Sequence, residues 1–226
     1  MRKPLSRRDL FRIAGALGLA ACDTGKPQQG LLGKMERTNR SVESFLFSPG
    51  REQHAGDVTP EMAFPVYHIA PEVPIAPAGW KLKIGGLVAR PRELSLEDLM
   101  GLPRTDARLE HHCVEGWSAI ADWHGVRLSE IAKLCGAETV DYVEFKSFDQ
   151  GYWSSWDRES ALHPQTMIAY GMNGHPLSAA HGAPARLYSA VKLGYKQVKY
   201  LTEINFLDHE TGGYWEAQGY EWYAGT

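Results

Sequence analysis

Cys113 lies in the densest group of chemistry-bearing residues, Leu109-Glu-His-His-Cys-Val-Glu-Gly-Trp117. A thiolate is a strong, soft metal ligand, and His111, His112 and the later His124 are also metal-binding residue types. If this stretch is a strand, His111 and Cys113 share a face because they are two residues apart, whereas His112 points to the other face. The pattern therefore predicts a metal site at Cys113 with one histidine beside it.

The cysteine spacing argues against a structural zinc site. Recurring zinc sites use paired ligands such as Cys-x-x-Cys or His-Glu-x-x-His, and the sequence contains neither pattern. Of the three cysteines, Cys22 belongs to the N-terminal segment, which leaves one possible bridge, between Cys113 and Cys135. Cys135 follows an apolar helical pattern and is predicted to be a small buried hydrophobe.

Short elements must position this site. Apolar periodicity and turn residues predict more strand than helix, with no internal repeat and no second domain after residue 59. Ser95 is a candidate N-cap and Gly136 a candidate C-cap. The predicted extended segments are Phe64–Ile69, Trp80–Ile84, Arg108–Val114, Tyr142–Ser147, Ala185–Tyr188 and Val198–Leu207, and the predicted helices are Leu94–Met100, Leu128–Leu134 and Ser160–His163.

Composition describes a globular chain that is large enough for a substantial core. The 226 residues are 43% hydrophobic and carry a formal charge of −3. No basic stretch follows the first dozen residues, so nucleic acid is excluded as an expected partner. The 23 Gly, 13 Pro, 7 Trp, 10 Tyr and 7 Phe predict many turns and bulky rings between short strands.

The first twenty-two residues form a targeting signal. Several basic residues precede the apolar run of residues 13–21, which is too short to span a bilayer. Ser6-Arg7-Arg8-Asp9-Leu10-Phe11 resembles a twin-arginine export signal, which serves proteins that fold before export. A general secretory signal with an accidental arginine pair is the alternative.

Leu19-Ala20-Ala21-Cys22 resembles a bacterial lipobox, in which Cys22 would be lipidated and become the mature N-terminus. The expected location is the periplasm, with the chain anchored to a membrane through this lipid. Removing residues 1–21 takes away five positive charges and one negative charge, so the net charge moves from −3 to −7. The expected organisation is a signal with a lipobox (1–22), a polar, turn-rich linker and N-terminal wrap (23–58), and one domain (59–226).

Four ordered motifs carry a resemblance that runs from about Thr59 to Tyr220. They are Cys113-Val-Glu-Gly-Trp-Ser118; Leu162-His-Pro-Gln-Thr-Met167 with Ala169-Tyr-Gly-Met-Asn-Gly-His-Pro-Leu177; His181-Gly-Ala-Pro-Ala-Arg-Leu187; and Gly194-Tyr-Lys-Gln-Val-Lys-Tyr200. The sequence resembles the sulfite-oxidase-type molybdopterin oxidoreductases, in particular the branch of the periplasmic protein-methionine-sulfoxide reductase catalytic subunit. The resemblance implies an α+β fold of mixed β-sheets with short helices in a single domain.

The same resemblance implies the cofactor and its ligands. Cys113 would bind molybdenum, which one molybdopterin also holds through its two dithiolene sulfurs, and the soft-ligand argument agrees. The phosphate of the pterin requires cationic donors. The implied cofactor-binding residues are Tyr67, His68, Ser147, His181, Arg186, Lys196, Gln197, Val198 and Lys199, with Gly194 allowing the backbone to bend near them.

The implied reaction is oxygen-atom transfer on a small-molecule or protein-bound oxide. Glu115 next to the cysteine disfavours an anionic substrate, so reduction of a sulfoxide, or a similar S- or N-oxide, is the preferred direction. His111, His112 and His124 are candidates for proton delivery. Without heme-attachment or iron–sulfur cysteine patterns, a separate electron donor is expected, such as a heme-bearing membrane subunit, and the enzyme itself is expected to be a monomer.

Two other functions remain open at this point. One is a sulfite-type oxidase of the same family. The other is a non-catalytic lipoprotein that binds its ligand through Tyr214, Trp215, Tyr220, Trp222 and Tyr223. Four further tryptophans, Trp117, Trp123, Trp153 and Trp156, are expected to line the pocket.

Overall fold

The computed structural model describes residues 30–47, 56–137 and 139–226. The chain divides into two compact units at Leu46 and Phe47. The expected signal, Cys22 and much of the expected linker lie outside the described residues. No helix in the described ranges has the length and apolar character needed to cross a membrane.

The first unit contributes α2, Gly30–Leu46. The sequence composition predicts a polar, turn-rich segment here, and the observed helix corrects that expectation. Residues 34–46 contain neither Gly nor Pro, so nothing in this stretch interrupts a helix. Asn39 donates a hydrogen bond to Glu43 one turn later, at 3.1 Å.

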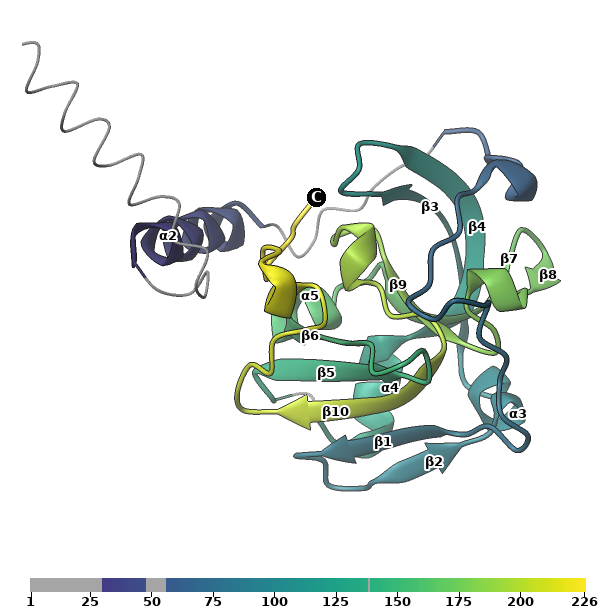
Figure 1. Cartoon of the computed structure of the whole chain (residues 1–226). Coiled ribbons are helices and arrows are strands. Elements are labelled where there is room, and N and C mark those ends of the chain that lie inside the picture. Colours follow the sequence, from purple (N-terminus) through teal and green to yellow (C-terminus); the bar gives the residue numbers. More distant parts are fainter. Residues whose placement is uncertain (1–29, 48–55, 138) are drawn as a thin grey trace, which may run out of the picture. The chain divides into compact units, whose positions relative to one another are not determined.

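The second unit contains two five-stranded sheets, which Figure 1 shows side by side. The first sheet has the order β2-β1-β10-β5-β6, in which β1 and β10 are parallel and the other neighbours are antiparallel. Its strands are β1 (Leu82–Gly86), β2 (Arg92–Leu94), β5 (Tyr142–Ser147), β6 (Trp153–Asp157) and β10 (Leu201–Leu207).

The second sheet is antiparallel throughout, with the order β3-β4-β7-β8 and with β9 paired to β7. The long pair of β3 and β4 places the end of β3 at the site described below. The strands are β3 (Arg104–His112), β4 (Ser118–Arg127), β7 (Thr166–Met172), β8 (His175–Pro176) and β9 (Arg186–Ser189).

The helices of this unit are short. Ser95 caps α3 through a capping box with Asp98, and Gly136 ends α4 in the left-handed conformation at φ 67°, as the sequence predicts. Cys135, at the end of α4, is fully buried. The helices are α3 (Leu96–Met100), α4 (Leu128–Cys135), α5 (Arg158–Ala161), and the 3-10 turns η1 (Glu61–Ala63), η2 (Ala179–His181), η3 (Gly194–Lys196) and η4 (Glu216–Gln218).

The main core joins both sheets and α4. Ile84 and Phe145 of the first sheet, Ile131 of α4, and Ile168 and Leu187 of the second sheet belong to one buried cluster. Removing such side chains from water supplies most of the stabilisation of the fold. The expected α+β fold of mixed sheets with short helices is confirmed.

Five strands were not predicted from the sequence, namely β2, β4, β6, β7 and β8. Every residue of β7 is buried, so it lacks the polar alternation that marks a half-exposed strand. Conversely, residues 64–69 form no strand. The backbone at the end of this segment donates hydrogen bonds to the side chain of Asp149 instead of pairing with a neighbouring strand.

Candidate active site

A cavity of about 440 Å³ opens beside the end of β3. Its walls come from segments far apart in the sequence, which only the tertiary fold brings together. Of the predicted site residues, the cavity is lined by Tyr67, His68, Cys113, His181, Arg186 and Lys199.

Cys113 lies immediately after β3, in the tight turn that leads into β4. Its N–H donates to the carbonyl of Trp117 at 2.9 Å, and its carbonyl accepts the N–H of Gly116 at 3.0 Å. Gly116 has φ +88°, a conformation that side chains disfavour. Burial raises the pKa of the Cys113 thiol. This half-buried sulfur has no disulfide partner, since Cys113 and Cys135 are both free.

His111 lines the cavity with Cys113, as the two-residue spacing predicts. It is 7% exposed, and its ring stacks on Trp117 and Tyr188 at centroid distances of 5.5 and 6.0 Å. Burial, followed by the charge of Arg186, lowers the pKa of His111 to about 3. The ring is therefore neutral near pH 7 and is a poor reservoir of protons for the reaction.

Gly194 acts by close approach to this histidine. A Cβ at position 194 would lie 2.5 Å from Nε2 of His111. Its φ is not positive, so its absent side chain, rather than the expected backbone bend, is what the site requires. His124 lies in a second cavity with Arg104 and Asp106, which separates it from Cys113 and removes it from the candidates for proton delivery.

Two buried cations face the main cavity. Arg186 is 4% exposed; one guanidinium nitrogen donates to the carbonyl of His181 at 3.0 Å, while its buried Nε has no hydrogen-bond partner. The ammonium of Lys199 donates to the carbonyl of Ala180 at 3.1 Å. Neither cation forms a salt bridge within the described ranges.

Burial away from water lowers the pKa of both cationic side chains. Burial lowers the pKa of Arg186 to about 10, and burial together with the charge of Arg186 lowers the pKa of Lys199 to about 7. Desolvating two neighbouring cations without a counter-ion is costly. This part of the cavity therefore favours a bound anion.

His181, Tyr67 and His68 complete the predicted residues at the cavity. His181 is 4% exposed, burial lowers its pKa, and its Nε2 lies 3.8 Å from a carboxylate oxygen of Glu61. Tyr67 is exposed and stacks on Trp117 at 6.3 Å. Nδ1 of His68 lies 2.6 Å from the carbonyl of Ala70.

The remaining four predicted cofactor residues lie outside the cavity lining. Lys196 is fully buried; it forms an ion pair with Glu216 and donates to the carbonyl of Ser155 at 3.0 Å. Its ammonium is already paired, which argues against the expected contact with a phosphate.

The other three act through internal contacts in this structure. The amide of Gln197 donates to the carbonyls of Ser189 and Lys192 at 2.7 and 2.8 Å. Val198 is a buried core residue, and the Ser147 hydroxyl accepts the N–H of Asp149 at 2.9 Å. Their direct contact with a cofactor stays a prediction.

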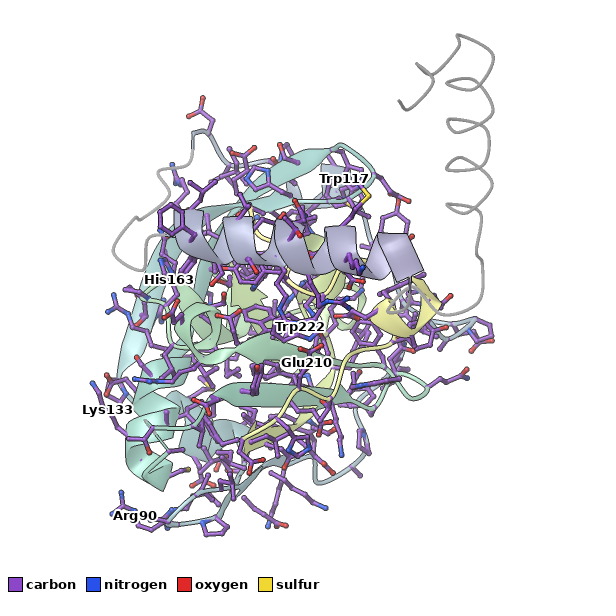
Figure 2. All side chains as sticks on the ribbon, turned by 90° about the vertical axis from the view of Figure 1, so that its left-hand side faces the viewer. Arg90, Trp117, Lys133, His163, Glu210 and Trp222 are labelled. Atoms are coloured by element: carbon purple, nitrogen blue, oxygen red, sulfur yellow. The ribbon has the colours of Figure 1, made fainter. Side chains whose placement is uncertain are left out.

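Three of the C-terminal aromatic residues form a wall of the same cavity. They are therefore not a separate ligand-binding surface of the kind expected for a non-catalytic lipoprotein. Tyr214, Trp215 and Tyr220 line the cavity, whereas Trp222 and Tyr223 are each 4% exposed. Of the four tryptophans expected to line the pocket, only Trp117 does so. Figure 2 shows Trp117 at the end of the domain opposite Arg90 and Lys133.

Several lining residues were not predicted from the sequence, namely Asp149, Tyr152, Tyr195 and Tyr200. Asp149 and Tyr152 belong to the turn between β5 and β6, and no local pattern marks such residues as parts of a site. Tyr195 and Tyr200 lie inside the Gly194–Tyr200 motif, each next to one of its lysines, and this adjacency is the signal in the sequence that marks them as candidates.

Residues 68–215 match the family model described as oxidoreductase molybdopterin binding domain. The chain belongs to this family. A putative protein-methionine-sulfoxide reductase subunit YedZ1 from Azospira oryzae is 37% identical over 92% of this molybdopterin-binding chain and 81% of its own. An uncharacterized oxidoreductase YuiH from Bacillus subtilis is 35% identical over 70% of this chain and 81% of its own.

Protein-methionine-sulfoxide reductase catalytic subunits MsrP are more distant relatives of this molybdopterin-binding protein. That of Xanthomonas axonopodis is 32% identical over 57% of this chain and 45% of its own, so the chain spans about half the length of this relative. Among solved structures, the sulfane dehydrogenase SoxCD of Paracoccus pantotrophus has a TM-score of 0.54 at 25% identity, covering 58% of this chain and 39% of that one.

The donors of the cavity fit a molybdenum–molybdopterin cofactor. Cys113 offers a soft sulfur ligand for the metal. Arg186 and Lys199 are desolvated cations without a salt bridge in the described part of the chain, and Arg186 also has an unbonded buried nitrogen, so both suit the pterin phosphate. These three residues are the ones that would hold the cofactor.

Proposed function

We propose that this molybdopterin-dependent oxidoreductase reduces a sulfoxide or a similar neutral S- or N-oxide. The observation that carries this proposal is the exposed carboxylate of Glu115 beside the metal-binding cysteine. The names of the sulfoxide reductase relatives support the same direction. When bound, the cofactor supplies two-electron oxygen-atom transfer.

Glu115 is fixed in place next to Cys113. The Cys113 thiol lies 3.9 Å from Oε2 of Glu115, and the indole N–H of Trp117 donates to the same oxygen at 3.1 Å. Hydrogen bonds from Trp117 and from the Tyr67 hydroxyl lower the pKa of Glu115. A fixed negative charge at this place repels an anion such as sulfite and tolerates a neutral sulfoxide.

The other residues of the cavity would bind the cofactor and contact the substrate. Arg186 and Lys199 would hold the anionic end of the cofactor. The lining rings would offer apolar surface to the methyl or alkyl groups of a sulfoxide; they belong to Tyr67, Trp117, Trp215 and Tyr220.

Paired assays with purified holoenzyme test this function. With reduced viologen as electron source, we expect turnover of dimethyl sulfoxide or methionine sulfoxide that exceeds sulfite oxidation with an electron acceptor by at least about tenfold in kcat/KM. A preference for sulfite would instead support the sulfite-type oxidase.

Glu115→Gln removes the charge and preserves the shape. We expect the KM for sulfite to fall by roughly three- to tenfold, because the variant removes one solvent-screened negative charge beside the substrate site. The KM for dimethyl sulfoxide should change less than about twofold. Glu93→Gln, on β2, is the matched control and should change neither value; equal shifts for both substrates in Glu115→Gln would contradict the charge argument.

We further propose that the protein is exported by the twin-arginine route and held at the periplasmic face of a membrane by lipid on Cys22. The arginine pair and the lipobox support this location. Cells fed labelled palmitate should yield a labelled protein, and Cys22→Ser should abolish the label. Equal labelling of both proteins would refute lipidation at Cys22.

We also propose that electrons come from a separate membrane protein, such as a heme-bearing subunit. The relative named as a subunit supports this arrangement. The chain itself lacks the cysteine patterns that attach heme or iron–sulfur clusters. Membranes from the source cells should therefore reduce the purified enzyme with a quinol, and heat-treated membranes should not; equal reduction by both would argue against a protein donor.

A further inference from the structure

The segment of residues 64–70, called here the N-terminal strap, covers part of the cavity without joining a sheet. It carries Tyr67 and His68, which line the cavity. At its start, Phe64 is 4% exposed. The Phe64 ring packs at centroid distances of 5.5 to 6.3 Å against His111, Trp117, Trp123 and His181.

A single carboxylate holds the other end of the strap. Oδ2 of Asp149 accepts the N–H of Ile69 at 2.7 Å, and Oδ1 accepts the N–H of Ala70 at 2.8 Å. Asp149 is 3% exposed and also lines the cavity. Charge-assisted bonds to a buried carboxylate are about twice as strong as neutral ones. This clamp therefore replaces the strand ladder that the strap lacks.

Hydrogen bonds also stabilise the turn that carries Asp149. The Ser147 hydroxyl accepts the N–H of Asp149 at 2.9 Å, and the N–H of Phe148 donates to the carbonyl of Tyr200 at 3.0 Å. Tyr200 directly follows Lys199, so the same turn connects the strap to the cationic part of the cavity. The charge of Asp149 also acts on Lys199 and favours its protonated form.

We propose that Asp149 is a positioning residue of the cofactor site, which clamps the strap so that Tyr67 and His68 line the cavity that would hold the cofactor. Ser147 is part of the same clamp, because its hydroxyl accepts the N–H of Asp149 and so orients this residue. The proposal rests on the family cofactor and not on the direction of the reaction.

Asp149→Asn tests the clamp at nearly constant side-chain volume. The amide keeps one acceptor oxygen and turns an N–H₂ group toward the second backbone N–H. In protein prepared without cofactor, we expect hydrogen exchange at Ile69 and Ala70 to accelerate by about tenfold or more. In loaded protein, we expect molybdopterin to dissociate at least about fivefold faster, measured by metal analysis after gel filtration.

Asp157→Asn is the matched control. Asp157 is also a largely buried carboxylate; it accepts the N–H of Ser160 and pairs with Lys192 at 3.1 Å, and it does not line the cavity. This variant should lower the thermal midpoint without changing exchange at Ile69 and Ala70 or the rate of cofactor loss. If both variants change exchange and cofactor loss equally, the role of Asp149 is only structural and the proposal is wrong.

Substitutions at Ser147 keep the proposal testable if Asp149→Asn fails to fold. Ser147→Thr preserves the hydroxyl and should retain wild-type exchange at Ile69 and Ala70, whereas Ser147→Ala should accelerate it. Unchanged exchange in Ser147→Ala and Asp149→Asn would overturn the clamp, whatever the enzyme reduces. Loss of sulfoxide turnover with normal exchange would instead bear on the proposed function.

Discussion

Cys113→Ser is expected to lower sulfoxide turnover with reduced viologen by more than about 100-fold while the fold persists. Changes to groups that merely support metal ligands cost about 10–100-fold, and this change replaces the proposed metal-binding sulfur with a hard hydroxyl. The fold should persist because the turn at Cys113 is held by backbone hydrogen bonds to Trp117 and Gly116. Turnover, metal content and circular dichroism measure these effects.

Cys135→Ala supplies the control for the loss of a free thiol. Cys135 is fully buried in the main core, away from the cavity lining, so its replacement should cost about 1 kcal/mol of stability and leave turnover within about twofold. Turnover retained by Cys113→Ser would remove this sulfur from the mechanism.

Arg186→Met is expected to affect stability and cofactor binding in opposite directions. The guanidinium is buried with no salt bridge in the described ranges and an unbonded Nε, and burial lowers its pKa to about 10. Replacing buried ion pairs with apolar side chains of similar volume is often neutral or stabilising by about 1–4 kcal/mol, because the desolvation penalty is removed. The same penalty is removed when the charged Arg186 side chain is replaced with methionine. The cofactor-free variant should therefore unfold at the same temperature as the wild type or higher.

The same variant should retain less than about a tenth of the wild-type molybdenum after purification, because the phosphate loses a charged donor. Thermal unfolding and metal analysis on parallel samples separate the two effects. Arg108→Met is the control, since Arg108 forms an exposed pair with Asp122 at 2.7 Å and should change neither quantity appreciably. A large loss of stability in Arg186→Met with normal metal content would show that Arg186 is a structural residue.

Local sequence patterns were sufficient to predict several helices and strands. The cap residues Ser95 and Gly136 mark α3 and α4, and the alternation of Tyr142–Ser147 marks β5, because these signals depend only on neighbouring residues. The spacing of His111 and Cys113 likewise placed both on the cavity side. In contrast, β7 is buried along its whole length, and a uniformly buried strand carries no alternation to read.

The sequence by itself determined the chemistry available to this protein, through a soft thiol with an acidic neighbour and through ordered motifs that carry the basic residues. Tertiary structure alone decided which of those groups meet. It turned Lys196 toward Glu216, brought Arg186 and Lys199 to one cavity, and joined Asp149 to a strap 80 residues earlier in the chain. The reason is physical: a side chain's charge and softness belong to the residue, whereas its burial and its partners depend on contacts between distant segments.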